Sequence, residues 1–400
     1  MFGFSHGKLR QHKRDRDPLL MKNFLSILVA VALSAISGAA LAAGVAAPIQ
    51  GGTSIGLSTG ATNGVFDPSI ADTASATRAW MCYSANNPST LFPTINTNVQ
   101  TTRLAYSDDA GATWTDDGVV NDITEATVSG QKITWTNEVC SLVYDPSAAS
   151  GTQWKLFWFH YSVINGNPVF SNSWIAFKQA STPAGLASAT EYKLFAGFAY
   201  NTANDTFEGA TYSPVAGSPI LSGSSFMSAD CPAFTEPGAT ENSSTEVVIE
   251  LNCPSSTAPR TVGLKCADPC TATSSGGWAF AGNPLNQADE AYFGTTALSG
   301  QDIYYEGTQP YLIVSPVGNQ PVTGSYQGCM VFRFTNIDVG AIGRNALGFP
   351  EPVNLVGGTG DTFNGACTRA QNVTAAGWGY GQVTFTNGVP SFDIKLTGAQ

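Results

Sequence analysis

Polar and apolar positions follow one order in five segments of the chain. Each segment begins with a small or polar residue, continues through a short apolar strand and a turn, and ends in a strand rich in aromatic residues. The segments span residues 66–84, 137–162, 229–252, 293–316 and the region from 366 onward. Between residues 45 and 400, apolar positions do not keep a helical spacing over several turns. The pattern therefore predicts an all-β protein.

The spacing between these segments indicates how the strands are grouped. We take Asp67, Glu138, Asp230, Thr295 and Cys367 as equivalent positions, which leaves each unit room for four strands. A sheet of that size cannot bury both faces alone, whereas neighbouring blades of a β-propeller cover one another. Because no Pro/Gly/Ser linker divides them, residues 43–400 are predicted to form one domain, a five-bladed β-propeller of four-stranded antiparallel blades. A β-sandwich is the alternative.

The first 42 residues carry the features of an export signal. A basic start precedes an apolar run over residues 24–36, and an Ala40-x-Ala42 cleavage site follows. The run is shorter than the ~20 residues that span a bilayer, which disfavours the alternative of a membrane anchor. We therefore expect residues 1–42 to be a signal peptide, with Met21 as a second candidate start. The remaining chain is expected to be secreted or periplasmic, without membrane attachment.

Composition narrows the class of partner. Charged residues make up 12% of the 400 residues, and the formal net charge is −11. An acidic protein is repelled by phosphate backbones and anionic lipids, so nucleic acid is not an expected partner. His160 is the one histidine after residue 42, which argues against a histidine-rich metal site. We expect a monomer without metal or cofactor.

The cysteines indicate disulfide bonds. All of them lie after residue 42, and an even number in an oxidising compartment is typical of paired cysteines. Their positions are Cys82, Cys140, Cys231, Cys253, Cys266, Cys270, Cys329 and Cys367. Cys266 and Cys270 are expected to close a short loop, because no second Cys/His pair is placed to complete a zinc site. The other pairings stay open.

Residues 107–114, Ser-Asp-Asp-Ala-Gly-Ala-Thr-Trp, match the S-x-D-x-G-x-x-W pattern of the Asp-box of sialidases and several other propellers. We expect a hairpin in which Asp109 binds backbone N–H groups, Gly111 takes a positive φ and Trp114 packs into the blade. The role of such a turn is structural, so Asp109 is not a catalytic candidate.

Three of the five segments begin with an acidic residue. These are Asp67 in F-D-P-S, Glu138 in N-E-V-C and Asp230 in A-D-C-P. Innermost strands of a propeller line its central funnel, so acids at equivalent strand starts converge on one pocket. Glycosidic bond cleavage needs one protonated and one ionised carboxyl group, and crowding of acids separates their pKa values.

The order of these motifs resembles the five-bladed glycoside hydrolases of families 43 and 32. In those families the first-blade acid lies in a D-P motif, the second blade adds an acid, and the third blade adds a Glu. The resemblance implies that Asp67 is the general base or nucleophile and Asp230 the general acid. It implies that Glu138 orients substrate and tunes the pKa of the acid. This sequence has Asp where the family has the third-blade Glu.

Aromatic and basic residues near these motifs are candidates for substrate binding. Trp80, Trp135 and Trp378 are expected to stack on sugar faces, with packing in the core as the alternative. Arg369 is expected to project into the funnel and bind a hydroxyl or carboxylate group of the ligand.

The leading hypothesis is a secreted hydrolase that cleaves an oligo- or polysaccharide of neutral or furanose-type sugars. A sialidase-like enzyme is one alternative, and it would need three arginines on the substrate carboxylate. A propeller that binds glycan or protein without catalysis is the other, and in it the acids only cap turns or contribute to solubility.

Overall fold

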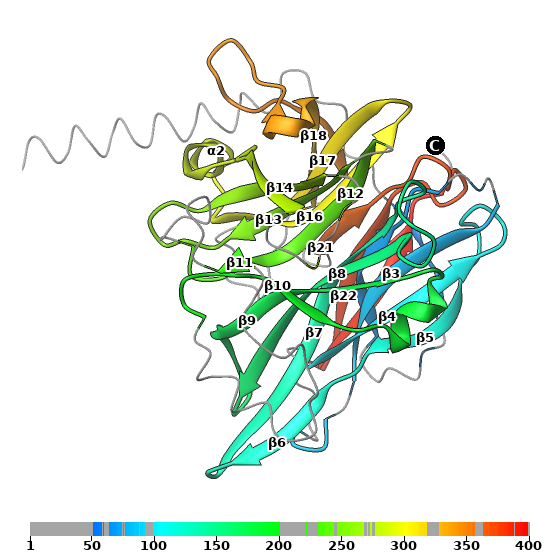
Figure 1. The fold of residues 1–400 in the computed structure, drawn as a ribbon, viewed down its shortest axis with the longest axis vertical. Helices are drawn as coiled ribbons and strands as arrows, with labels where there is room; N and C mark the ends of the chain where they lie inside the picture. Colours follow the sequence, from blue (N-terminus) through cyan, green and yellow to red (C-terminus); the bar gives the residue numbers. More distant parts are fainter. Residues whose placement is uncertain are drawn as a thin grey trace, which may run out of the picture. The chain divides into compact units, whose positions relative to one another are not determined.

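Five sheets, antiparallel except for the β10–β11 pair, contain nearly all the regular structure of this computed structural model (Figure 1). Blade 1 consists of β2 (Val65–Ile70), β3 (Ala79–Asn86), β4 (Gln100–Ser107) and β5 (Thr115–Asn121). Blade 2 consists of β6 (Thr124–Val128), β7 (Gln131–Tyr144), β8 (Trp154–Ile164), β9 (Asn167–Ala180), β10 (Tyr192–Ala196) and β11 (Leu221–Ser222). Blade 3 consists of β12 (Thr235–Ser243), β13 (Glu246–Cys253), β14 (Arg260–Ala267) and β15 (Trp278–Gly282).

Blades 4 and 5 complete the fold. Blade 4 consists of β16 (Ala297–Glu306), β17 (Gln309–Val317), β18 (Cys329–Asn336), β19 (Ala341–Ile342) and β20 (Pro352–Val356). Blade 5 consists of β21 (Phe363–Thr368), β22 (Gly379–Thr386), β23 (Val389–Leu396) and the early strand β1 (Thr53–Ser54). Short helical segments lie between strands: η1 (Ala184–Ser188), α2 (Gln287–Phe293) and η4 (Ile337–Val339). The predicted all-β, five-bladed architecture is confirmed, although blades 2 and 4 carry extra short strands.

The structure describes residues 51–398 with internal gaps. The gaps are residues 58, 60–63, 74, 76, 88, 93–98, 201–220, 223–230, 244–245, 268–269, 271–272, 274–276, 318–327, 357–362 and 388. The predicted signal peptide, residues 1–42, lies outside the described residues. Residues 45–400 group into one compact unit by their contacts. Within the described residues, no helix is long and apolar enough to cross a membrane.

One strand in each blade carries the same irregularity. The pairing of β2, β7, β12, β16 and β21 with the following strand shifts register once or twice in each of the five sheets. The residues with positive φ at this shift are Asp67 (51°), Val139 (45°), Glu236 (54°), Gly300 (61°) and Ala366 (43°). A β-bulge of this kind redirects the side chains around it and is common beside functional sites. These five residues are therefore the structurally equivalent positions of the blades.

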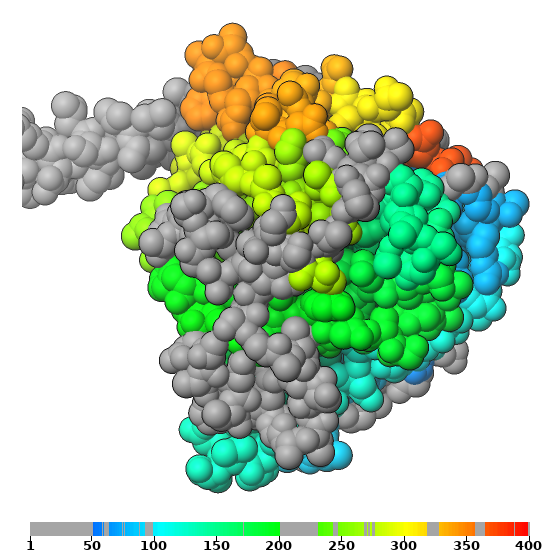
Figure 2. Space-filling model, in the orientation of Figure 1, coloured from blue at the N-terminus to red at the C-terminus, as the bar shows by residue number. Residues whose placement is uncertain are grey.

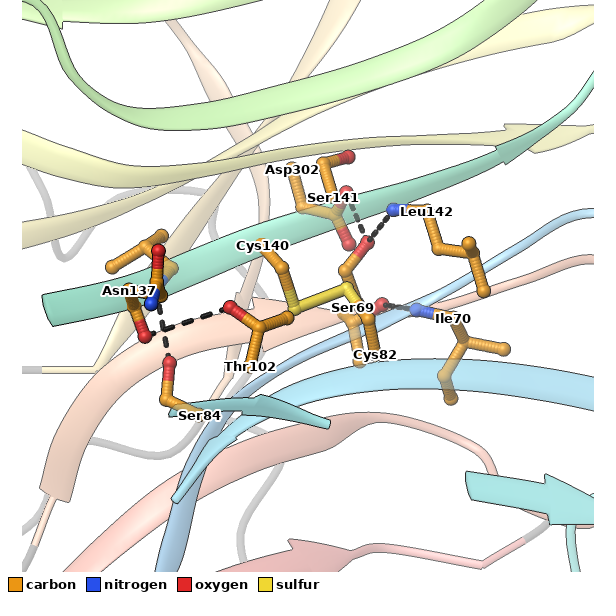
Figure 3. Close-up of a disulfide and its surroundings, with 12 residues drawn as sticks. Ser69, Ile70, Cys82, Ser84, Thr102, Asn137, Cys140, Ser141, Leu142 and Asp302 are labelled. Atoms are coloured by element: carbon orange, nitrogen blue, oxygen red, sulfur yellow. Dashed lines mark hydrogen bonds between the residues drawn. A yellow bond between two sulfur atoms is a disulfide. The ribbon is translucent and has the colours of Figure 1, made fainter. Parts of the chain in front are cut away.

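Hydrogen bonds connect each blade to the next. Leu142 N–H donates to Ser69 Oγ between blades 2 and 1, as Figure 3 shows, and Ala239 N–H donates to Ser141 Oγ between blades 3 and 2. Gly300 N–H donates to Glu236, and Ala366 N–H donates to Ser315 Oγ, which joins blade 4 to blades 3 and 5. Ile70 N–H donates to Thr368 Oγ1 over 2.9 Å and connects blade 1 with blade 5. These bonds satisfy backbone groups that would be costly to bury unpaired.

Apolar packing fills the spaces between blades. One cluster joins Phe157 and Phe177 of blade 2 to Ile249 and Leu264 of blade 3. Other clusters join blade 1 to blade 5 and blade 4 to blade 5. In Figure 2 the surface of blade 2 (green) adjoins that of blade 3 (yellow-green). Blades therefore cover the faces that a single sheet leaves exposed, as the propeller prediction requires.

The eight cysteines form four disulfides. Cys82–Cys140 joins β3 of blade 1 to β7 of blade 2 (Figure 3), and Cys329–Cys367 joins β18 of blade 4 to β21 of blade 5. Cys231–Cys253 and Cys266–Cys270 lie within blade 3. The short loop expected at Cys266 and Cys270 is confirmed. The two disulfides between blades cross-link neighbouring sheets and reduce the conformational entropy of the unfolded chain.

The turn at residues 107–114 connects β4 to β5. Asp109 accepts hydrogen bonds from the Thr113 N–H and from the hydroxyl groups of Ser107 and Thr113, at 2.7–2.8 Å. Those bonds lower the pKa of Asp109 to about 2, with the Thr113 side chain as the largest cause. Gly111 has a φ of 90°, and Trp114 Nε1–H donates to the Gly111 carbonyl at 3.0 Å. The geometry is that of the structural hairpin the motif predicts.

Glu250 on β13 is a buried acid. Its burial predicts that the stability of the folded protein depends on pH. Its side chain is fully buried, and neither carboxyl oxygen has a hydrogen-bond partner among the described residues. Burial raises its pKa well above 4.5, so the folded state retains a proton that the unfolded state loses. The contribution of this proton to the free energy of unfolding is fully present below pH 4.5. It is lost as the pH rises towards the folded pKa, at about 1.4 kcal/mol per pH unit.

We expect Glu250→Gln to remove this loss. The variant should unfold at a higher temperature than the wild type at pH 8 and at a similar temperature at pH 4.5. Thermal unfolding followed by circular dichroism across this range measures the difference. Parallel pH profiles for the two proteins would contradict the assignment.

Candidate active site

Three carboxylates from three blades meet at the bulges of the innermost strands. Asp67 belongs to β2, Glu138 to β7 and Glu236 to β12. Glu138 and Glu236 both act electrostatically on Asp67, and Glu236 acts on Glu138. Asp67 is 8% exposed, and the two glutamates are partly buried. Residues separated by 71 and 98 positions in the sequence therefore form one acidic cluster.

Each carboxylate is held by polar groups from a neighbouring strand. Tyr161 Oη on β8 donates to Glu138 Oε2 over 2.9 Å. The Ser84 hydroxyl bonds with the carboxyl group of Asp67 and accepts from Val139 N–H at 3.0 Å, which ties the first and second blades. Gly300 N–H donates to Glu236 Oε2 over 2.6 Å. Side chains with fixed partners are preorganised, which a catalytic site requires.

Burial and mutual repulsion keep protons on this cluster. Desolvation is the largest cause that raises the pKa of Asp67 well above its usual value, followed by the charges of Glu138 and Glu236. Desolvation also raises the pKa of Glu138 to about 8, against the lowering effect of the Tyr161 hydrogen bond. Carboxyl groups that interact electrostatically titrate in coupled steps. The cluster therefore retains a proton at neutral pH, as a general acid must.

The structure brings together two of the three predicted acids. Asp67 and Glu138 lie in the cluster, whereas Asp230 lies outside the described residues. Glu236 is the residue that the sequence reasoning missed, and Asp230 and Thr295 are not the equivalents of Asp67. The signal was present: T-E-P-G at 235–238 repeats the acid-proline pair of F-D-P-S at 66–69. Asp230 stands at the start of the third segment, whereas the bulge that holds the acid is at Glu236, six residues further along the chain.

The predicted sugar-stacking rings pack against other rings of the protein. Trp135 is 1% exposed and stacks on His160, with ring centroids 5.3 Å apart. Trp378 is 2% exposed and packs edge-on against Tyr304. Trp80 on β3 is half-buried against Tyr106. Trp135 and Trp378 are therefore core residues in this structure, which corrects their predicted role, and Trp80 is not part of the cluster.

Arg369 has a different environment from the one predicted. Its guanidinium group pairs with Glu306 at 2.9 Å and lies over the rings of Trp378 and Tyr304. The other arginines after residue 42 have partners in separate parts of the fold, such as Asp116 for Arg103 and Asp289 for Arg344. Within the described residues, no group of three or more His, Cys, Asp or Glu side chains is arranged to hold a metal ion.

Comparisons with known proteins give structural similarity without sequence similarity. No protein-family model matches the chain, and no curated protein matches it. Similar solved structures include a family 117 glycoside hydrolase of the marine bacterium Zobellia galactanivorans, with 10% identity and a TM-score of 0.47 over 84% of this chain and 86% of that one. They also include the catalytic domain of a family 62 α-L-arabinofuranosidase of Coprinopsis cinerea, with 10% identity and a TM-score of 0.45 over 88% and 95%.

A third similar structure is a family 32 glycoside hydrolase of Bifidobacterium adolescentis. Its identity is 10% and its TM-score 0.47, over 83% of this chain and 55% of that one. At these scores the similarity alone establishes neither fold nor function, and the strand order and bulges described above define the propeller.

Proposed function

We propose that this protein is an exported glycoside hydrolase whose acid-base machinery is Asp67, Glu138 and Glu236. The observation that carries the proposal is the coupled cluster of three carboxylates at equivalent bulges of blades 1, 2 and 3. The resemblance of the Asp67 and Glu138 motifs to family 43 and 32 propellers agrees with it. Four disulfides agree with an oxidising compartment.

The chemistry divides between the three groups. Asp67 takes the role of general base or nucleophile that the resemblance of its D-P motif implies. Burial and the charges of Glu138 and Glu236 raise its pKa, and the Ser84 hydrogen bond opposes that rise. Glu236 takes the general acid role assigned by sequence to Asp230, and its longer side chain agrees with the family's third-blade Glu. Glu138 orients substrate, and its contact with both neighbours sets how protons are shared. This mechanism uses carboxyl groups alone.

A sialidase-like function has less support. That chemistry uses three arginines around one substrate carboxylate, whereas the arginines here have separate partners in different blades. The substrate that fits an acidic cluster is a neutral oligo- or polysaccharide, because anionic sugars would be repelled.

The test is a screen of the purified secreted protein against neutral aryl pyranosides, aryl furanosides and plant and microbial polysaccharides. Release of sugar by the wild type, but not by Asp67→Asn, supports the proposal. Binding of a polysaccharide without any release would favour the non-catalytic propeller.

The pH dependence of this activity is expected to report on Tyr161. Because the cluster must retain a proton, kcat/KM should fall as the pH rises through about 8. The Tyr161 hydrogen bond lowers the pKa of Glu138, so Tyr161→Phe should move this alkaline limb upward by about one pH unit. Tyr304→Phe removes a buried hydroxyl of blade 4 and should leave the limb unchanged. Equal profiles for wild type and Tyr161→Phe would exclude the coupling.

A further inference from the structure

A cavity opens where the strands that carry the bulges end, beyond the carboxylate cluster. Its volume is about 330 Å³, and residues from all five blades line it. The lining begins at Ile70, Leu142, Ala239 and Ile303, which follow the bulge of their strands by three residues, and continues to Tyr144, Glu241 and Tyr305. At about 3.3 Å per residue, the bulge and the cavity mouth lie on the order of 15 Å apart along a strand.

A layer of small polar side chains separates the two sites. Ser69, Ser141, Asp302 and Thr368 occupy the positions between bulge and cavity, and all are buried. Ser69 Oγ donates to Asp302 Oδ1, as Figure 3 shows, and Ser141 and Thr368 bond to neighbouring blades. The cavity is therefore distinct from the acidic cluster and has its own opening, because Gly307, Thr308 and Gln371 are exposed.

The lining is rich in hydrogen-bond acceptors held in fixed positions. Asp72 Oδ1 accepts from Gln371 N–H at 2.6 Å and its Oδ2 from Tyr305 N–H at 3.4 Å, which fixes the carboxylate between blades 1, 4 and 5. Tyr305 Oη donates to the Asn242 side chain at 3.0 Å. Glu241 adds a second carboxylate, and among the described residues that line the cavity there is no Lys, Arg or His.

This chemistry selects the ligand. Carboxylate oxygens can accept more than one hydrogen bond, which favours a ligand that donates, and their charge disfavours an anionic ligand. Ammonium groups only donate, whereas the Thr308 hydroxyl of the lining can both donate and accept. A polyhydroxyl compound satisfies both kinds of group, and the rings of Tyr144 and Tyr305 offer apolar contact to sugar C–H groups. The volume lies within the roughly 300–1,000 Å³ range of small-molecule sites.

We infer that this cavity is a second saccharide site, which binds one or two neutral sugar units independently of the acidic cluster. The site would hold one part of a glycan on the propeller while other parts of the same glycan reach the carboxylates. This increases the effective substrate concentration at the carboxylates. Binding here does not depend on hydrolysis, so it goes beyond the proposed function.

The test uses the Asp67→Asn protein, in which the proposed hydrolysis is blocked. Ligand-observed NMR measures binding of xylobiose, cellobiose and methyl α-L-arabinofuranoside, with glucuronate and tetramethylammonium as charged probes. Thr308→Trp, at an exposed rim position, fills the mouth of the cavity. Thr384→Trp, at an exposed position of β22 in blade 5, is the matched control.

We expect at least one neutral sugar to bind, with affinity reduced tenfold or more by Thr308→Trp and unchanged by Thr384→Trp. Binding of tetramethylammonium alone would overturn the saccharide assignment, and so would sugar binding that is insensitive to Thr308→Trp or absent. Hydrolysis of a small aryl glycoside is measured separately with the single variant Thr308→Trp, in which Asp67 is intact. This variant should cleave the glycoside at the wild-type rate. Absence of cleavage by the wild type would contradict the proposed function while leaving the binding result interpretable.

Discussion

Asp67→Asn is expected to lower kcat/KM by at least about 10³-fold on every glycoside that the wild type cleaves. The amide is nearly isosteric with the carboxyl group but cannot accept a proton from water or attack the anomeric carbon. The site offers no equivalent group, because Glu138 and Glu236 lie on other blades, where Tyr161 and Gly300 hold them. Initial rates with a chromogenic aryl glycoside measure the loss.

Glu250→Gln is the matched control for this change. It also converts a buried acid to an amide, but in the interior of blade 3, and neither of its oxygens bonds to another described residue. We expect its activity at neutral pH to equal that of the wild type. Equal losses in both variants would mean that Asp67 supports the fold and takes no part in the reaction.

Glu236→Gln is expected to separate substrates by their leaving group. A sugar leaving group needs a proton, so kcat/KM for an oligosaccharide should fall by about 10²–10⁴-fold. A dinitrophenolate leaves without protonation, so the loss on dinitrophenyl glycosides should stay within about tenfold. The ratio of the two losses reports the general acid directly.

Glu138→Gln is the companion variant, since it removes the other glutamate of the cluster. Similar losses on both substrates are expected, because Glu138 orients substrate and shares protons with its neighbours. If Glu138→Gln shows the leaving-group pattern and Glu236→Gln does not, the acid role belongs to Glu138 and the present assignment is wrong.

Local patterns were sufficient to predict the blades. The five repeated segments fall on the strand pairs β2–β3, β7–β8, β12–β13, β16–β17 and β21–β22. They could be found because a strand's apolar alternation and its turn residues are encoded within about 20 neighbouring positions. The hairpin around Asp109 was predicted for the same reason. Blade 2 departs from four strands in two places: the first part of the long strand β7 pairs with β6, and β11 pairs in parallel with β10.

The composition of the site depended on strand register, which the sequence does not display. Asp230 and Glu236 are both acids near the start of blade 3, and only the bulge at Glu236 identifies the equivalent of Asp67. Likewise, the local sequence around a tryptophan does not show whether its ring faces solvent or the core. Trp135 and Trp378 face the core because the neighbouring rings of His160 and Tyr304 cover them.

The central claim is that acids from three blades titrate as one cluster, and carboxyl ¹³C NMR of protein labelled at glutamate and aspartate tests it most directly. The Glu138→Gln spectrum identifies the Glu138 signal, which should titrate at about pH 8 in the wild type. Because the charge of Glu236 raises the pKa values of both Glu138 and Asp67, Glu236→Gln should lower both. A Glu138 signal that titrates near 4.5, or at the same pH in wild type and Glu236→Gln, would contradict the account.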